Sequence, residues 1–261
     1  MVYDYETARK VWESKVPIEF ILDSDTQNSR PLYVMIPRIS YFCLQLPKII
    51  SFFFGEQDER IDPDTVSLEY CSQPVKAYYP VGVLYDMYKA KSAEFWSITV
   101  RRNEKPLGTA LRKDQMEQMY MQSVKEADFM KRKAEVIYSM RDEDHRQLWN
   151  GIVHYNFEEF WLVNKRLMLT SSDQSFLHIP LRLYESGKPF KQVPLKPTQE
   201  SGEEATLSSA LAQLYPNLDI STTEFFSHGI SLPLNTPLTY LAENIAYPDN
   251  FVHVCAVPVE S

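Results

Sequence analysis

The three thiols are the first residues of this sequence that could carry nucleophilic chemistry. Cys43, Cys71 and Cys255 are odd in number and far apart, so they predict neither a disulfide framework nor a paired metal site. Each lies in a predicted strand, helix face or turn among apolar neighbours, where a thiol is usually an inert packing residue. We therefore expect reduced, unreactive cysteines of the kind found in the cytosol.

Histidine and carboxylate side chains also gather near the middle of the chain, which raises the question of metal or acid–base chemistry. His145 and His154 have the wrong spacing for a helical ligand pair, and Asp142, Glu143 and Asp144 supply no clear third ligand. A capping or surface role explains these side chains better. With only seven glycines and no glycine-rich phosphate loop, the sequence predicts no catalytic residue, no metal site and no cofactor.

Lys125 offers a different kind of chemistry, because a primary amine can accept an acyl group from a thioester. It lies within a predicted helix, and Met121 and Phe129 share its face at four residues before and after it. Most helix lysines are simply solvated, but two large apolar neighbours on an outward face suit a docked protein. An ordinary lysine amine is protonated at neutral pH, and no base lies near it in sequence. Activation would have to come from conjugating enzymes.

Gly82 marks a second position of interest. It follows Tyr79 and Pro80 at a predicted strand-to-helix turn. Glycine is needed where a side chain would not fit, so internal packing is the first explanation of this residue. Close approach of a partner helix is the second.

Composition and charge exclude several classes of protein. The 261 residues are 44% apolar and 13% aromatic, which is enough for more than one packed core. The net charge of −8 disfavours a nucleic-acid binder, and acidic neighbours dilute the basic run at 131–133, which predicts a solvated helix face. The apolar run at 52–54, of the kind a membrane would accept, falls far short of the ~20 residues of a membrane span. We expect a soluble protein whose membrane contact is peripheral.

Residues 1–105 show strand and helix patterns in alternation, after a leading helix. Alternation at Ile18, Phe20 and Leu22 and again over 32–36 predicts a hairpin with one buried face, joined by a turn-prone loop at 23–30. A helix within 41–53, strands at 66–70, 75–79 and 96–100, and a turn at 72–74 complete the block. This order of strand, strand, helix and three strands is that of a ubiquitin-like fold.

Residues 114–171 predict a helix-rich domain. Apolar residues recur every three or four positions from Met116 to Ile137 without glycine or proline, which indicates one long amphipathic helix. Asp114 is its expected N-cap, with Glu117 three residues on. Two further helices are predicted at 144–149 and 156–168.

Residues 176–259 repeat the pattern of the first block. Strands are predicted at 179–183, 225–230 and 252–256, with a turn at 187–189 and a helix at 207–215. The spacing of Pro80 and Leu84 before a strand returns at Pro237 and Leu241, which weakly indicates an internal duplication. The sequence thus predicts an α+β protein in which two ubiquitin-like (β-grasp) domains flank a helix-rich domain.

Five strings, in order and spread over residues 10–258, resemble the autophagy protein 5 family. Tyr33–Tyr41 resembles YLLLPRVSY, and Tyr79–Asp86 resembles YPIGLLFD. Lys125–Asp128 is similar to the end of MKEAD, although Val124 replaces its methionine. Asp144–Trp149 followed by Phe160 and Trp161 resembles DHKQLW…FW, and Tyr247–Phe251 matches YPDNF.

This resemblance implies specific partners and no bond chemistry of the chain's own. The ubiquitin-like autophagy protein 12 would be joined to Lys125 by an isopeptide bond. The N-terminal helix of autophagy protein 16 would bind a groove built from all three domains, and the match at Tyr79, Pro80, Gly82 and Asp86 implies that these residues contact it. The complex would then promote transfer of autophagy protein 8 from its conjugating enzyme onto phosphatidylethanolamine. We therefore expect a cytoplasmic scaffold, peripheral at the forming autophagosome membrane. An adaptor with ubiquitin folds that is never conjugated stays open as the alternative.

Overall fold

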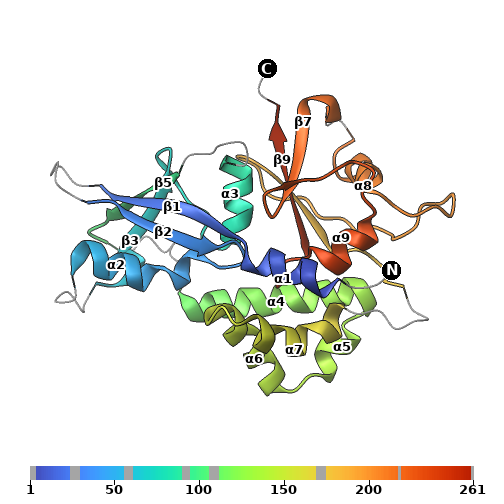
Figure 1. The fold of residues 1–261 in the computed structure, drawn as a ribbon, viewed down its shortest axis with the longest axis horizontal. Coiled ribbons are helices and arrows are strands. Elements are labelled where there is room, and N and C mark those ends of the chain that lie inside the picture. The colour runs from blue at the N-terminus through green and yellow to red at the C-terminus, as the bar shows by residue number, and fades with distance from the viewer. Residues whose placement is uncertain are drawn as a thin grey trace.

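Two sheet-containing halves lie side by side over a layer of helices in the computed structural model (Figure 1). The structure describes residues 4–23, 30–55, 61–89, 95–105, 112–168, 175–216 and 219–259. Most of the predicted loop at 23–30, and most of the linkers between the predicted domains at 106–113 and 172–175, fall outside these residues. The arrangement is the predicted α+β fold of two β-grasp domains and a helix-rich domain.

The first half is a five-stranded sheet covered on one face by helices. Its elements are β1 (Lys15–Leu22), β2 (Leu32–Pro37), α2 (Leu46–Phe54), β3 (Val66–Tyr70), β4 (Gln73–Pro74), α3 (Val81–Lys89) and β5 (Trp96–Arg102). The strand order is β2-β1-β5-β3-β4, with β1 and β5 parallel and the other neighbours antiparallel. The alternation of β1 explains its position, because Val16, Ile18 and Phe20 are fully buried beneath the helices.

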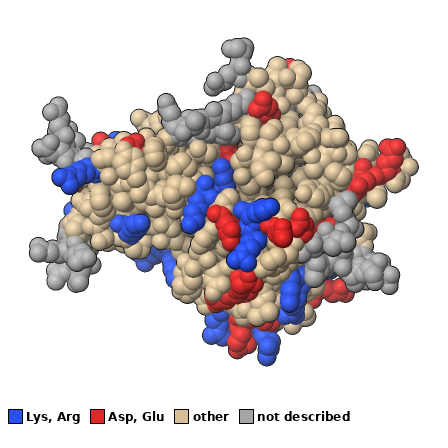
Figure 2. All heavy atoms as spheres, in the orientation of Figure 1, with Lys and Arg blue, Asp and Glu red and all other residues tan. Residues whose placement is uncertain are grey.

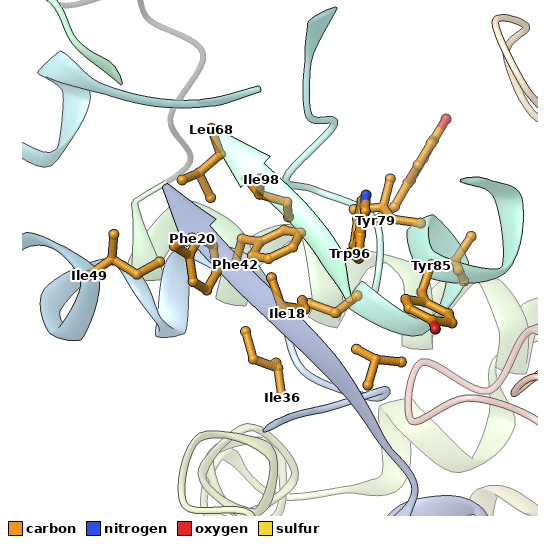
Figure 3. Close-up of a cluster of buried hydrophobic side chains, with 14 of the residues drawn as sticks. Ile18, Phe20, Ile36, Phe42, Ile49, Leu68, Tyr79, Tyr85, Trp96 and Ile98 are labelled. Carbon is orange, nitrogen blue, oxygen red and sulfur yellow. The ribbon is translucent and has the colours of Figure 1, made fainter. Parts of the chain in front are cut away.

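The core of this half is built on aromatic contacts. Trp96 opens β5 and lies fully buried, with the rings of Phe42 at 5.8 Å and Tyr85 at 6.0 Å between centroids. Figure 3 shows these side chains gathered around Ile18 of β1. Aromatic rings bury large apolar areas, so this cluster stabilises the sheet and its helices together.

The second half repeats this topology with four strands. Its elements are β6 (Leu181–Glu185), α8 (Leu207–Leu214), β7 (Thr223–Ser227), β8 (Ile230–Ser231), α9 (Leu238–Asn244) and β9 (Val252–Pro258). The order is β6-β9-β7-β8, and the parallel pair β6–β9 corresponds to β1–β5. Residues 190–195 take the place of β2 through single bridges from Leu195 to Ile179 and from Lys191 to Leu183. The shared connectivity agrees with the predicted internal duplication.

The helical layer is formed by α4 (Lys113–Arg132), α5 (Glu135–Ser139), α6 (Asp142–Val153) and α7 (Phe157–Met168). The leading helix α1 (Tyr5–Glu13) belongs to this layer in space, since Trp12 packs 4.8 Å from Phe160 between ring centroids. At its N-terminus the amide of Asp4 donates to Asn244 of α9 at 3.0 Å. The helix thus ties the helical layer to the second sheet domain.

The predicted strand at 75–79 is wrong. The chain already turns at Cys71 and Ser72, which both have positive φ, and Gln73–Pro74 pair with Glu69–Tyr70 as β4. The amide of Val75 still donates to the carbonyl of Leu68 at 2.8 Å, after which residues 77–79 turn away from the sheet.

A strand-to-helix turn is predicted at Gly82, but the predicted order of elements contains no helix after it, where the structure has α3. Residues 81–87 of this helix are all buried, because α3 lies between the two sheet domains. A helix covered on every side has no polar stripe, so its sequence lacks the 3.6-residue alternation that reveals a surface helix.

The long helix predicted from Met116 to Ile137 is broken near its end. Lys133 and Ala134 have left-handed φ values of 55° and 63°, which end α4 and start α5 in a new direction. Asp128 then accepts hydrogen bonds from the amides of Val136 and Ile137 at 3.0 and 2.8 Å. The start differs as well, because Arg112 and not Asp114 is the N-cap.

Lys131 contradicts the prediction of a solvated basic face. Its side chain is only 1% exposed, and its Nζ lies 3.1 Å from Asn250 Oδ1 and 3.3 Å from the carbonyl of Leu167. Burial, with help from the neighbouring Arg132 charge, lowers the pKa of Lys131 to about 7. The amine therefore joins α4, the end of α7 and the turn before β9 at a buried point.

We predict that Lys131→Met weakens the pH dependence of stability between pH 7 and pH 9.5. The unfolded chain carries a lysine with a pKa of about 10.4, so above pH 7 it binds more protons than the folded chain. Stability of the wild type must therefore rise with pH in this window, by up to about 1.4 kcal/mol per pH unit from this group. Urea unfolding of both proteins across the window measures the difference. Parallel curves for the two proteins would contradict the assignment.

Candidate functional site

A groove of about 610 Å³ opens where the three domains meet. Its apolar floor combines Tyr79 and Pro80 of the first sheet domain, Met116 and Tyr120 of α4, and Tyr184 of β6. Tyr78 and Met119 stand at 39% and 41% exposure, so they form accessible apolar sides above this buried floor. The groove also carries a row of amides on α4, namely Gln115, Gln118 and Gln122.

One end of the groove is polar and held by a buried arginine. Arg182 of β6 lies 3.7 Å from the ring centre of Phe251 and 4.9 Å from that of Phe190. Its guanidinium donates to Glu126 of α4 at 3.0 Å and lies 3.6 Å from Asp249. This side chain therefore fixes α4 against the second sheet domain at the groove wall.

Asp249 and His253 complete the polar end. His253 Nε2 lies 3.0 Å from both oxygens of Asp249, and its Nδ1 lies 2.7 Å from the hydroxyl of Tyr184. Burial would raise the pKa of Asp249, but the interactions with His253 and Arg182 outweigh it and leave this pKa lowered. The carboxylate is thus ionised and fully engaged, which suits a rigid wall better than proton transfer.

The structure separates the four residues predicted to contact a partner helix. Tyr79 and Pro80 line the groove. Gly82 and Asp86 lie in α3, buried between the two sheet domains, where Gly82 donates its amide to the carbonyl of Arg38 at 2.8 Å. A direct contact of Gly82 or Asp86 with a partner helix therefore conflicts with their burial.

Asp86 is the centre of a buried polar contact between the sheet domains. Arg38 Nη1 donates to its Oδ1 at 2.6 Å, and the amide of Gly229 donates to its Oδ2 at 2.9 Å. Burial raises the pKa of Asp86, and the Arg38 charge opposes this shift only in part. A β-carbon on Gly229 would stand 2.5 Å from the Arg38 guanidinium, so glycine is required at this contact.

Lys125 is half-buried on α4 and lies beside the groove. Within the part of the chain that the structure describes, its amine has no ion pair or hydrogen bond. Lys125 is six positions beyond Met119 and is therefore rotated by about 120° from that side chain, but it is seven positions beyond Gln118 and shares the face of that groove residue, about two turns further along α4. Phe129 is 62% exposed on its face, whereas Met121 packs partly against the helical core. Of the two exposed apolar neighbours expected beside Lys125, only Phe129 is therefore exposed.

The other chemistry-bearing residues are dispersed. His145 contacts the carbonyl of Ile137 at 3.2 Å, and Asp144 accepts from the amide of Arg141 at the start of α6. No group of three His, Cys, Asp or Glu side chains that could hold a metal occurs among the described residues. Figure 2 shows acidic and basic side chains interspersed over the helical layer on the visible face, without a basic stripe.

The cysteines differ from one another. Cys43 and Cys255 are buried, and burial raises the pKa of the Cys43 thiol to about 12 and that of Cys255 well above its usual range. Cys71 is exposed at the turn between β3 and β4, which corrects the expectation that all three are packed inside. Across the described helices, none is long and apolar enough to cross a membrane.

Sequence reasoning missed the residues that form the polar end of the groove. In the sequence, Asp249 stands out only as part of the Tyr247–Phe251 string, and neither Arg182 nor His253 is predicted as a site residue. Arg182 and His253 interrupt strands that are otherwise buried and apolar, and this interruption was the available signal. Their meeting at one site depends on the parallel pairing of β6 with β9, which no local pattern reveals.

We predict that Gly82→Ala destabilises the protein by about 1–3 kcal/mol, because an added methyl group overpacks a filled interface. The new β-carbon would meet Arg38 Cβ and the Tyr247 hydroxyl at 2.7 Å each. Gly82→Glu should destabilise the protein more, because its longer side chain has even less room in this interface. Urea unfolding measures the loss. Full stability of Gly82→Ala would show that the interface opens easily at this point.

Three family models match the chain in order. "Autophagy protein ATG5, UblA domain" matches residues 11–102, "alpha-helical bundle region" matches residues 113–170 and "UblB domain" matches residues 178–256. Together they cover most of the chain, and their ranges contain the two sheet domains and the helical layer.

Relatives of similar length agree with these matches. The chain is 38% identical to autophagy-related protein 5 of Caenorhabditis elegans over 96% of this chain and 97% of that protein. It is 33% identical to autophagy protein 5 of Drosophila melanogaster over 97% of each. The crystal structure of autophagy protein 5 from Kluyveromyces marxianus has the same fold, with a TM-score of 0.81 at 20% identity over 97% of this chain and 100% of that one. The chain belongs to the autophagy protein 5 family.

Proposed function

We propose that this protein is a non-enzymatic scaffold of autophagosome formation with two separate binding roles. It receives autophagy protein 12 through an isopeptide bond at Lys125 and holds the N-terminal helix of autophagy protein 16 in the three-domain groove. The assembled complex promotes transfer of autophagy protein 8 from its conjugating enzyme onto phosphatidylethanolamine. The protein itself works in the cytoplasm, peripheral to the forming membrane.

The groove is the observation that carries this proposal. Its apolar floor and sides, its amide row on α4 and its polar end form a complement to an amphipathic helix. Because all three domains contribute walls, a helix seated there would hold the domains in one arrangement. The contacts of Arg182 with Glu126 of α4 and with Asp249 supply a rigid wall for such a helix.

The surroundings of Lys125 support a role as an acceptor of an acyl group. Its amine is not engaged by a carboxylate in the described part of the chain, and the exposed ring of Phe129 offers an apolar contact for an incoming protein. No base stands near this amine in sequence. The activation of the bond would therefore belong to the conjugating enzymes and not to this chain.

The buried thiols support a scaffold without a covalent intermediate of its own. A thiolate is the nucleophile in thioester chemistry, and burial keeps Cys43 and Cys255 protonated. Cys71 is exposed on a β-hairpin turn of the first sheet domain, and it does not line the groove.

Lys125→Arg should abolish the covalent adduct with autophagy protein 12. Arginine keeps the charge and the helix propensity of lysine, but its guanidinium stays protonated and cannot form an isopeptide bond. Reconstitution with the purified conjugation enzymes, followed by a denaturing gel, measures the adduct. Binding of an autophagy protein 16 helix peptide should be unchanged, since Lys125 is not a wall of the groove.

Lys133→Arg is the matched control, because Lys133 is an exposed lysine at the end of the same helix. This variant should form the adduct at full strength. A full-strength adduct on Lys125→Arg would mean that another lysine is the acceptor. No adduct on the wild type would favour the alternative of an unconjugated adaptor.

Met119→Asp should weaken binding of the helix peptide by at least about tenfold, which is about 1.4 kcal/mol. Met119 is an accessible apolar side of the groove, and an unpaired carboxylate there would lose its water when a helix docks. Phe129→Asp is the control, because Phe129 lies on α4 outside the groove. Calorimetry with both variants decides between groove binding and binding elsewhere on α4, where Phe129→Asp would have the larger effect.

A further inference from the structure

The outer edge of β2 is a second surface of this protein that lacks a described partner. β2 pairs with β1 on one side only and ends the five-stranded sheet. Two of its side chains, Tyr33 and Met35, are 55% and 56% exposed. Exposed backbone together with exposed apolar side chains is the combination from which strand pairing with another chain starts.

The register of the hairpin shows which backbone groups are free. The amide of Arg38 donates to the carbonyl of Ser14 at 3.0 Å, and bonded pairs alternate along an antiparallel ladder. The pairs Val16–Ile36 and Ile18–Val34 therefore bond across the ladder, whereas Pro17–Met35 and Glu19–Tyr33 do not. The amides of Tyr33 and Met35 thus point away from β1, and no described residue accepts from them.

The other sheet edges of this chain are blunted, which makes β2 the exception among the described strands. β4 and β8 are two residues long, and β4 contains Pro74. Residues 190–195, which correspond to β2 in the second sheet domain, contain Lys191 and Pro194, and Gln192 among them bonds to Glu126 of α4. Short length, lysine, proline and covering by a helix are the known means of protecting an edge. β2 has six residues and no charge, and its one proline, Pro37, stands at its last position.

The face beside this edge offers matching side-chain contacts. Tyr33 lies 5.1 Å from Phe95 between ring centroids, and Met35 stands opposite Pro17 on the same open side of the sheet. The hydroxyl of Tyr33 is engaged by Glu19 at 2.7 Å, so its ring is held along the edge. Tyr33, Met35, Pro17 and Phe95 thus form an apolar strip beside two free amides, and the Glu19 carboxylate within it is already bonded to Tyr33.

We propose that the β2 edge at Tyr33–Met35 is a docking site for a short extended segment of another protein, uncharged and apolar at alternating positions. Only an extended backbone can satisfy alternating outward N–H and C=O groups, and the apolar strip would receive every second side chain. Pro31 and Pro37 flank the edge and lack N–H groups, so the added strand is short. This site is separate from the groove and from Lys125.

Two variants of Met35 test the backbone and side-chain parts of the site. Met35→Lys places a charge on the edge, and Met35→Pro removes an outward N–H that makes no bond to β1. Ile21→Lys is the matched control, because Ile21 is exposed on the same open face but lies on the inner strand β1. Thermal unfolding of the three variants shows that they are folded.

The probe is a library of displayed random peptides. Peptides that bind the full wild-type chain are selected first, and those that also bind the Met35→Lys variant are then removed. The best synthetic peptide should bind Ile21→Lys like the wild type and Met35→Pro at least about tenfold more weakly. It should also slow hydrogen exchange at the amides of Tyr33 and Met35. An empty selection, or equal loss of binding on Ile21→Lys, would overturn strand addition at this edge. Dimerisation of the wild type that Met35→Lys abolishes would show that the occupant is a second copy of the chain.

Discussion

The buried ion pair between Arg38 and Asp86 is the contact on which the arrangement of the sheet domains depends. Arg38 follows β2, Asp86 lies in α3, and the amide of Gly229 from the second sheet domain completes the carboxylate's bonds. A buried charge without its partner is costly, so the two domains meet in the one position where all three groups are satisfied. Gly82 and Gly229 both lie against Arg38. Glycine suits these two positions because a β-carbon at either one would collide with the Arg38 side chain.

The groove is a consequence of this fixed arrangement. Once α3 joins the sheets, α4 closes them from below, and Arg182 and Lys131 connect it to the second sheet domain at two points. The space left between the three domains becomes the groove. Its walls are therefore sensitive to residues that never touch a ligand, and Gly82 and Asp86 can influence binding through the interface they hold.

The groove, Lys125 and the free edge of β2 lie at different places on the molecule. The groove is lined by α4 residues within 115–123, while Lys125 and Phe129 lie further along the same helix. At a rise of about 1.5 Å per residue, Phe129 lies roughly 9 Å beyond Ser123, so the groove and the surroundings of Lys125 are successive stretches of α4. The free edge of β2 lies in the first sheet domain and belongs neither to the groove nor to the surroundings of Lys125.

The periodic elements and the family could be predicted from the amino-acid sequence alone. Alternation at Ile18 and Phe20 marked β1, the helical spacing from Met116 onward marked α4, and the strings at Tyr79–Asp86 and Tyr247–Phe251 pointed to the autophagy protein 5 family. Local patterns suffice for these because each reflects a single buried face.

Features that depend on contacts between distant segments could not be predicted in this way. α3 was hidden because both sheet domains cover it, and Lys131 appeared solvated because Asn250 and Leu167, which surround it, are far away in sequence. The role of Asp86 as an internal ion-pair partner and the union of Arg182, Asp249 and His253 have the same cause. A charged or polar residue type predicts an exposed side chain only where that part of its domain faces water. At an interface between domains, the partner that balances a buried charge comes from elsewhere in the fold.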